Sequence, residues 1–233
     1  MSAALPFVRI SAFYACYFGA IGVLLPYLGL YLQHSGYSAI AIGQLMAVLM
    51  AMRILAPGLW AWWADATGWR TVLMRSAAIA APLMFLGVIR GDSFAGLAVA
   101  LGLFGIAWAG VLPQFEATAE NAPAKKRRLF DAVLWGSLGF IMAVVVGGLL
   151  FSGDRVDLVP AVALGLLVMT AVAIVLTPPA AGEPRDRPTG RLLSVLRRRE
   201  VLGLLIGCVL LQASFGTYYV FFTIYLRDLG YSS

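Results

Sequence analysis

Long apolar runs, separated by short polar segments, follow one another along the whole chain. Each run has about 20 residues, the length at which an α-helix crosses the ~30 Å hydrocarbon core of a bilayer. The strands of a membrane barrel would instead alternate polar and apolar positions in pieces of ~10 residues. The pattern therefore predicts membrane-spanning helices at residues 7–32, 39–63, 72–90, 94–119, 130–151, 158–177 and 201–227.

Composition supports this prediction by excluding other classes of protein. Hydrophobic residues make up 61% and charged residues 12% of the chain, about half the charge of an ordinary soluble domain. The two cysteines, Cys16 and Cys208, lie in apolar runs and are expected to be buried thiols, and a single histidine excludes a histidine-rich metal site. We expect an all-α polytopic membrane protein with no metal and no cofactor.

Basic residues are distributed unevenly over the segments between the predicted helices. If the N-terminus is cytoplasmic, most of the 17 Lys and Arg residues fall on the cytoplasmic side, including the cluster at 125–128. This asymmetry follows the positive-inside rule. It predicts a multi-pass protein of the inner (cytoplasmic) membrane with its N-terminus inside. The net charge of +6 then reflects topology and contact with anionic lipid, so no nucleic-acid partner is expected.

Two octapeptides near opposite ends of the chain are similar. Residues 31–38 read YLQHSGYS, residues 225–232 read YLRDLGYS, and each follows an apolar run on the predicted outer side. An even number of predicted helices separates them, so the repeated units are parallel. The two halves of the major facilitator superfamily are parallel repeats of this kind, and the chain resembles that superfamily.

The resemblance implies a major facilitator superfamily fold in truncated form. We expect a six-helix N-terminal bundle at 1–177, followed by a cytoplasmic inter-domain loop at 178–200 that is rich in proline, glycine and charge. Residues 201–233 would then form the first helix of a C-terminal bundle whose remainder is absent. An inactive truncated fragment is accordingly one interpretation of the chain.

The loop between the second and third predicted helices carries a short motif. Residues 61–70 read AWWADATGWR and resemble the superfamily signature G-x-x-x-D-R-x-G-R-R at Asp65, Gly68 and Arg70. Glycine at position 68 permits a tight turn, and an aspartate at a helix end can pair with a cation. We predict a cytoplasmic gate at this loop. The alternative is an ordinary solvated turn.

Charged side chains inside predicted spans are costly in a bilayer and are typical of functional sites. Arg53 lies in the middle of the second predicted helix, and Glu116 lies in the inner half of the fourth. Glu120 follows one turn later on the same face. Because a carboxylate can bind and release a proton, Glu116 is the leading candidate for proton coupling, and all three are candidates for coupling or substrate binding. A structural Arg53–Glu116 ion pair and a capping role for Glu120 remain open.

Polar and aromatic side chains on the first and seventh predicted helices are candidates for lining a substrate cavity. A tyrosine combines an apolar ring with one hydroxyl, which suits an amphipathic organic solute. Interhelical packing is the alternative role for these candidates, which are Tyr14, Tyr17, Gln212 and Tyr218. Glycines of the fifth helix predict close packing against a neighbour instead; they are Gly136, Gly139, Gly147 and Gly148.

Three longer segments resemble one family within the superfamily. The first helix from FYACYFG, the segment LWGSLGF at 134–140 and the segment CVLLQASFGTYY at 208–219 are similar to the 3-phenylpropionate transporter family, which is related to the lactose permease and nucleoside–proton symporters. The family's acidic residue three positions after a proline is matched by Glu116, and its intramembrane arginine by Arg53. Val133 stands where the family often has a basic residue, which leaves the charge of the substrate open.

This resemblance implies a secondary active transporter that imports an aromatic acid, such as phenylpropionate, or another small organic solute together with a proton by alternating access. Its partners would be the solute, the proton and the lipid bilayer, and the complete protein would be monomeric. A drug or metabolite efflux antiporter of the same superfamily is the alternative within transport. An enzyme is not expected, because one histidine and no cluster of paired carboxylates leave little catalytic chemistry at membrane depth.

Overall fold

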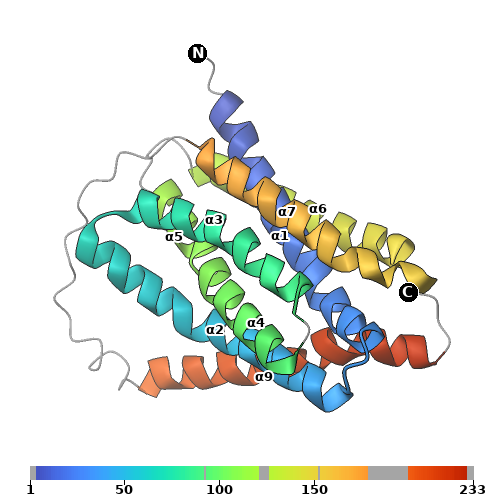
Figure 1. Ribbon diagram of the computed structural model, residues 1–233. Helices are drawn as coiled ribbons and strands as arrows, with labels where there is room; N and C mark the ends of the chain where they lie inside the picture. Colours follow the sequence, from blue (N-terminus) through green and yellow to red (C-terminus); the bar gives the residue numbers. More distant parts are fainter. Residues whose placement is uncertain (1–3, 92, 121–125, 152, 178–198, 230–233) are drawn as a thin grey trace.

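The computed structural model describes residues 4–91, 93–120, 126–151, 153–177 and 199–229 (Figure 1). These described residues form helices and no strand, which confirms the all-α prediction. The elements are α1 Ala4–His34, α2 Ala39–Thr67, α3 Arg70–Ile89, α4 Phe94–Ala109, α5 Val111–Glu120, α6 Lys126–Leu150, the short 3₁₀ helix η1 Gly153–Leu158, α7 Val159–Val175 and α9 Arg199–Asp228.

Six stretches of the described residues are long and apolar enough to cross a membrane as helices. They are Val8–His34, Ala39–Thr67, Arg70–Ile89, Phe94–Ala117, Val133–Leu150 and Arg155–Val175. They coincide with the first six predicted spans. The seventh predicted span corresponds to helix α9, and its crossing of the membrane stays a prediction. Nearly all of the loop predicted at 178–200 lies outside the described residues.

The helices pack in two groups that meet along α3 and α7. In one group α1 contacts α6 and α7, and in the other α4 contacts α2 and α3 (Figure 1). Of the most apolar stretch of α1, 67% is buried, compared with 11% of the corresponding stretch of α6. Helix α1 is therefore central, whereas α6 leaves a broad apolar surface for lipid or for another part of the protein to cover.

Glycines bring α6 into backbone contact with α1. A Cβ atom added to Gly139 would overlap the carbonyl oxygen of Ala15, so a side chain at this position would force the two helices apart. Further along the same interface, the Tyr27 hydroxyl donates a hydrogen bond of 2.7 Å to the carbonyl of Val144. Small residues allow this kind of close approach inside membranes. The packing role predicted for glycines of this helix is confirmed at Gly139.

Two arginines converge on the last turn of α7. Arg9 of α1 donates to the carbonyl oxygen of Leu176 at 2.8 Å, and Arg75 of α3 donates to that of Thr177 at 2.9 Å. The last carbonyls of a helix have no partner within the helix, and they carry partial negative charge. The two guanidinium groups therefore satisfy the end of α7 and fix it to the beginnings of α1 and α3.

Candidate functional site

The predicted gate motif forms a closed turn between α2 and α3. Gly68 adopts a left-handed conformation with φ +71°, and its N–H donates to the carbonyl of Ala64 at 2.9 Å, which ends α2. Arg70, the first residue of α3, donates to the carboxylate of Asp65. The structure thus brings the three motif residues together across the turn. Their role in gating stays a prediction.

The fourth predicted span is found as one apolar stretch, Phe94–Ala117, but its helix is interrupted at Gly110. Helix α4 ends at Ala109 and α5 begins at Val111, and the N–H of Gly110 bonds to the carbonyl of Ala107 at 3.2 Å. A regular α-helix would direct the N–H of residue 110 to the carbonyl of residue 106. The indole of Trp60 in α2 instead donates to the Ile106 carbonyl at 2.7 Å.

Trp60 also occupies the space beside the interruption. A Cβ atom on Gly110 would lie 2.7 Å from the Trp60 ring, so a larger residue there would displace the indole. A side chain that enters the helical hydrogen-bond ladder is a known cause of a kink. The glycine and the tryptophan together therefore set the direction in which α5 continues.

A cluster of five buried aromatic side chains joins α1 to α4 and α5; we call it the aromatic cluster. Phe13 stacks on Phe115 with ring centroids 3.9 Å apart, and Tyr17 stacks on Trp108 at 4.3 Å. Tyr14 meets Phe115 edge to face at 5.7 Å. Tyr14 and Tyr17 are only 1% and 4% exposed. This burial favours the packing alternative for both tyrosines over direct lining of a substrate cavity.

The charged candidates lie beside the aromatic cluster. The Tyr14 hydroxyl points to the Glu116 carboxylate with 3.5 Å between the oxygens, the outer limit of a hydrogen bond. Arg53 and Glu116 both lie within electrostatic range of the Tyr17 hydroxyl. We call Arg53, Glu116 and these two tyrosines the polar group. The Glu116 side chain is exposed at the surface of the described bundle, and Arg53 is half-buried.

The remaining predicted site residues are not part of the polar group. Glu120 is the last residue of α5 and Gln212 lies in α9, and the side chains of both are outside the described residues. Tyr218 of α9 is 52% exposed and stacks on Phe222 with ring centroids 4.6 Å apart. The structure therefore leaves Tyr218 among the untested candidates for substrate contact.

Two residues of this region were missed by the sequence analysis. Gln114 is a polar residue at membrane depth, 2% exposed, two positions before Glu116. Its type and its place next to a predicted site residue could have singled it out. Trp60 was missed because a tryptophan in an apolar span gives no sequence signal of the carbonyl to which it donates.

The polar group holds the chemistry of a carboxylate, a guanidinium and two phenols. In the part of the chain that the structure describes, no three His, Cys, Asp or Glu residues lie close enough to hold a metal ion. A carboxylate exchanges protons, and a guanidinium binds anions and hydroxyl groups through directed N–H donors. This combination suits proton exchange and recognition of a polar solute.

Among the described residues, six apolar stretches long enough to cross a bilayer, a charged turn between α2 and α3 and ionisable side chains within those stretches define a polytopic membrane protein. A family model described as the MFS_1 like family matches residues 7–233. The chain therefore belongs to the MFS_1 like family, within the major facilitator superfamily.

Two known transporters are similar to the chain. It is 31% identical to the maltose permease of Geobacillus stearothermophilus over 195 residues. This aligned region covers 83% of this chain and 48% of the permease. The fold of the chain matches the crystal structure of a mutant of the nucleoside transporter NupG with a TM-score of 0.82 at 15% identity, over 96% of this chain and 59% of the other. The chain thus spans about half the length of the maltose permease.

The comparisons bear on the earlier predictions to different degrees. Both relatives are membrane transporters and not enzymes, in agreement with the expectation from the sequence. The superfamily and its fold are confirmed. The narrower resemblance to the 3-phenylpropionate transporter family stays a prediction, as do the substrate and the use of protons.

Proposed function

We propose that the chain contributes the N-terminal bundle of a secondary active transporter, which imports a small organic solute together with a proton by alternating access. The observation that carries this proposal is the polar group, where the Tyr14 hydroxyl points to the Glu116 carboxylate at 3.5 Å. Membership of the MFS_1 like family supports transport as the activity. Residues 1–177 would form the bundle, 178–200 the cytoplasmic loop and 201–233 the first helix of a second bundle, in a monomeric protein of the cytoplasmic membrane with its N-terminus inside.

In this proposal Glu116 carries the proton. An ionised carboxylate is expensive to enclose at membrane depth, whereas a protonated one is far less so. Protonation at one side of the membrane would therefore allow the site to close, and release of the proton at the other side would complete the cycle. Tyr14 would hold the ionised carboxylate in place by donating to it, because a phenol is a donor that carries no charge.

Arg53 would contact the solute. A guanidinium binds a carboxylate through two parallel hydrogen bonds, so an aromatic acid, the substrate class implied by the family resemblance, suits this residue. A sugar is the second candidate substrate, favoured by the similarity to the maltose permease. Guanidinium and carboxylate groups also bind hydroxyls, so uptake measurements must compare both classes of solute.

The turn between α2 and α3 would act as the cytoplasmic gate. The ion pair of Asp65 and Arg70 lies at an exposed helix end, where its partners can exchange as helices move. Gly68 would keep the turn tight in both conformations. Loss of the gate would raise leakage of solute rather than abolish its binding.

Uptake by the full-length protein in proteoliposomes tests the proposal. We expect an inward proton gradient to drive accumulation of a labelled aromatic acid such as 3-phenylpropionate, with maltose and a nucleoside as the comparison solutes. Glu116→Gln should abolish accumulation driven by the gradient and retain exchange of solute down its own gradient. Glu200→Gln, at an exposed glutamate in the first turn of α9, serves as the matched control.

Three outcomes would contradict the proposal. Full gradient-driven accumulation by Glu116→Gln would refute the proton role of that residue. Export of solute in exchange for entering protons would instead identify an efflux antiporter. Absence of transport of every solute by the wild-type protein, with normal folding, would support an inactive chain.

A further inference from the structure

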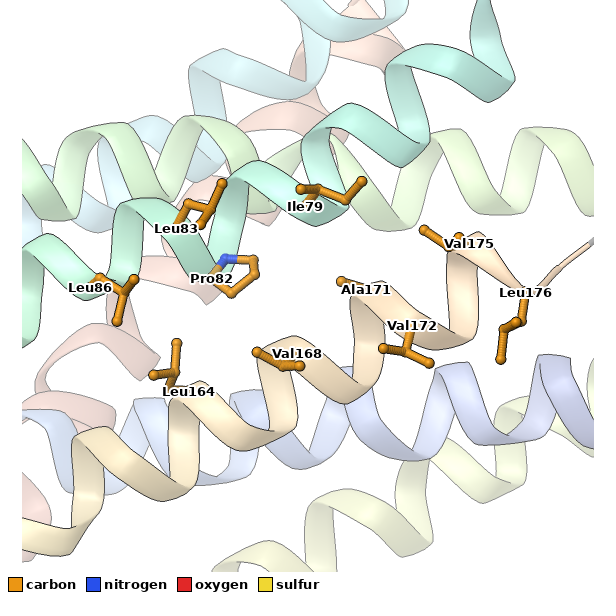
Figure 2. Close-up of a pocket in the computed structure, with 10 residues that line it drawn as sticks. All are labelled: Ile79, Pro82, Leu83, Leu86, Leu164, Val168, Ala171, Val172, Val175 and Leu176. Carbon is orange, nitrogen blue, oxygen red and sulfur yellow. The ribbon is translucent and has the colours of Figure 1, made fainter.

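An apolar cavity of about 410 Å³ opens between α3 and α7 (Figure 2). Pro82 and Leu86 point from α3 toward α7, and Leu164 and Val168 point back toward α3. All the residues that line it are apolar. Such a cavity does not hold ordered water, because water needs polar partners.

The α7 wall of the cavity is about as long as one leaflet of a bilayer is thick. The walls of the cavity belong to the spans Arg70–Ile89 and Arg155–Val175. From Leu164 to Leu176 the α7 wall is about 18 Å long at 1.5 Å per residue. Half of the ~30 Å hydrocarbon core is about 15 Å. An apolar chain that runs along α7 would therefore match the length of this wall.

Positive charge stands at one end of the cavity. Leu176 lines that end, and its carbonyl accepts the hydrogen bond from Arg9. Arg75 lies one turn before the lining residue Ile79 and donates to the adjacent carbonyl of Thr177.

Both arginines have binding capacity left. The Nε atom of Arg75 is buried and has no hydrogen-bond partner, and neither Arg9 nor Arg75 forms an ion pair with a carboxylate among the residues that the structure describes. Each guanidinium has five N–H donors, of which the carbonyl bonds use few. Among the described residues, the pair thus presents positive charge that no carboxylate neutralises, at the end of the apolar cavity.

We propose that the cavity between α3 and α7 binds one acyl chain of an anionic phospholipid, and that Arg9 and Arg75 bind its phosphate. The apolar wall accounts for the chain, and the two guanidinium groups account for the negative headgroup. A bound lipid fills the space between the two helix groups and fastens α3 to α7 at this end. A zwitterionic lipid fits the cavity equally well but gains less from the arginines.

Native mass spectrometry of the purified chain, titrated with phosphatidylglycerol or phosphatidylcholine, tests this site. We expect one phosphatidylglycerol to bind more tightly than the rest and more tightly than phosphatidylcholine. Arg9→Gln and Arg75→Gln should each weaken that binding roughly fivefold, since a basic residue at an anionic membrane surface contributes about that factor. The double variant should bind both lipids alike.

Two tryptophan variants on α7 distinguish lipid bound in this cavity from lipid bound elsewhere on the apolar surface. Val168→Trp should fill the cavity and remove the tight phosphatidylglycerol, whereas Met169→Trp, at a 57% exposed position outside the cavity lining, should leave it bound. Helical content and elution volume of each variant confirm that it folds. Equal lipid binding by Val168→Trp and Met169→Trp, or no preference of the wild type for phosphatidylglycerol, overturns the proposal. Loss of a dimer in Val168→Trp with lipid binding unchanged overturns it in favour of contact between copies of the chain.

Discussion

The helix pairs α1–α6 and α3–α7 belong to the same bundle and are built of similarly apolar sequence, yet they pack in opposite ways. At the first pair, Gly139 lets the two backbones touch and Tyr27 adds a hydrogen bond to the facing helix. At the second pair, leucine and valine side chains face each other across a cavity of about 410 Å³. Hydropathy alone does not distinguish the two interfaces.

The difference follows from side-chain size. Membrane helices gain little from the hydrophobic effect when they associate, because lipid is as apolar as a leucine side chain. Close backbone contact and interhelical hydrogen bonds must supply the stability, and both need small residues at the interface. The pair α1–α6 is therefore a fixed part of the bundle, and α3–α7 is a place that a lipid can fill.

Among the variants at the two interfaces, Gly139→Ala should lower the stability of the protein most. The added methyl overlaps the Ala15 carbonyl and forces α1 and α6 apart, which we expect to cost about 3 kcal/mol. The melting temperature of the purified protein measures this loss. Gly165→Ala on α7 is the matched control, since nothing lies within 4 Å of a Cβ at that position. Equal melting temperatures of the two variants would show that α1 and α6 are not in backbone contact.

Trp60→Phe tests a third helix pair, α2–α4, where a side chain of α2 donates to a helix interruption beyond the close packing at Gly105. The variant loses the donor to the Ile106 carbonyl and part of the ring beside Gly110. We expect a destabilisation of about 2 kcal/mol, and a weaker response of uptake to the proton gradient because α5 is no longer held in direction. Trp62→Phe, at a 72% exposed position on the same helix, is the control. If uptake by Trp60→Phe depends on the proton gradient as in the wild type, the helix interruption at Gly110 has no role in proton coupling.

Tyr27→Phe removes one hydrogen bond from the α1–α6 interface and leaves its shape intact. Interhelical hydrogen bonds in membranes contribute about 0.6 kcal/mol on average, so we expect a small but measurable fall in melting temperature. Tyr225→Phe, at a 59% exposed position on α9, should leave the melting temperature unchanged. A lower melting temperature for Tyr225→Phe than for Tyr27→Phe would show that the hydrogen bond from Tyr27 to the Val144 carbonyl does not stabilise the protein.

Ile79→Phe should have the smallest effect, because it adds volume where the α3–α7 interface has space. We expect a change within about 0.5 kcal/mol, as for a position that no neighbour constrains. The measurement is the melting temperature in detergent, compared directly with Gly139→Ala. A fall in melting temperature as large as that of Gly139→Ala would show that the α3–α7 and α1–α6 interfaces are equally tightly packed.

The positions of the helices could be predicted well from the sequence. The length and hydropathy of an apolar run are properties of consecutive residues, so the first six predicted spans coincide with the six found in the structure. The motif at Asp65, Gly68 and Arg70 could be predicted for the same reason, because the turn joins neighbours in sequence.

The orientation of each helix about its axis could not be predicted. Helix α1 is apolar on all sides, so its sequence has no polar face to show which side meets the other helices. The sequence therefore could not show whether Tyr14 and Tyr17 line a substrate cavity or pack between helices. In the structure their rings pack against Phe115 and Trp108. The interruption at Gly110 was missed because its cause, the Trp60 indole, lies fifty residues away in the chain.

The interruption at Gly110 separates α5 from α4, and Glu116 lies on the short helix α5 beyond it. The carboxylate residue lies five positions beyond the start of α5, about 8 Å along the axis at 1.5 Å per residue. A tilt of about 10° at Gly110 moves that point by roughly 1.3 Å. The separation of 3.5 Å between the Tyr14 and Glu116 oxygens would then become either a firm bond or a broken one. A small change of angle at Gly110 would thus make or break a contact of an ionisable group without any movement of α4.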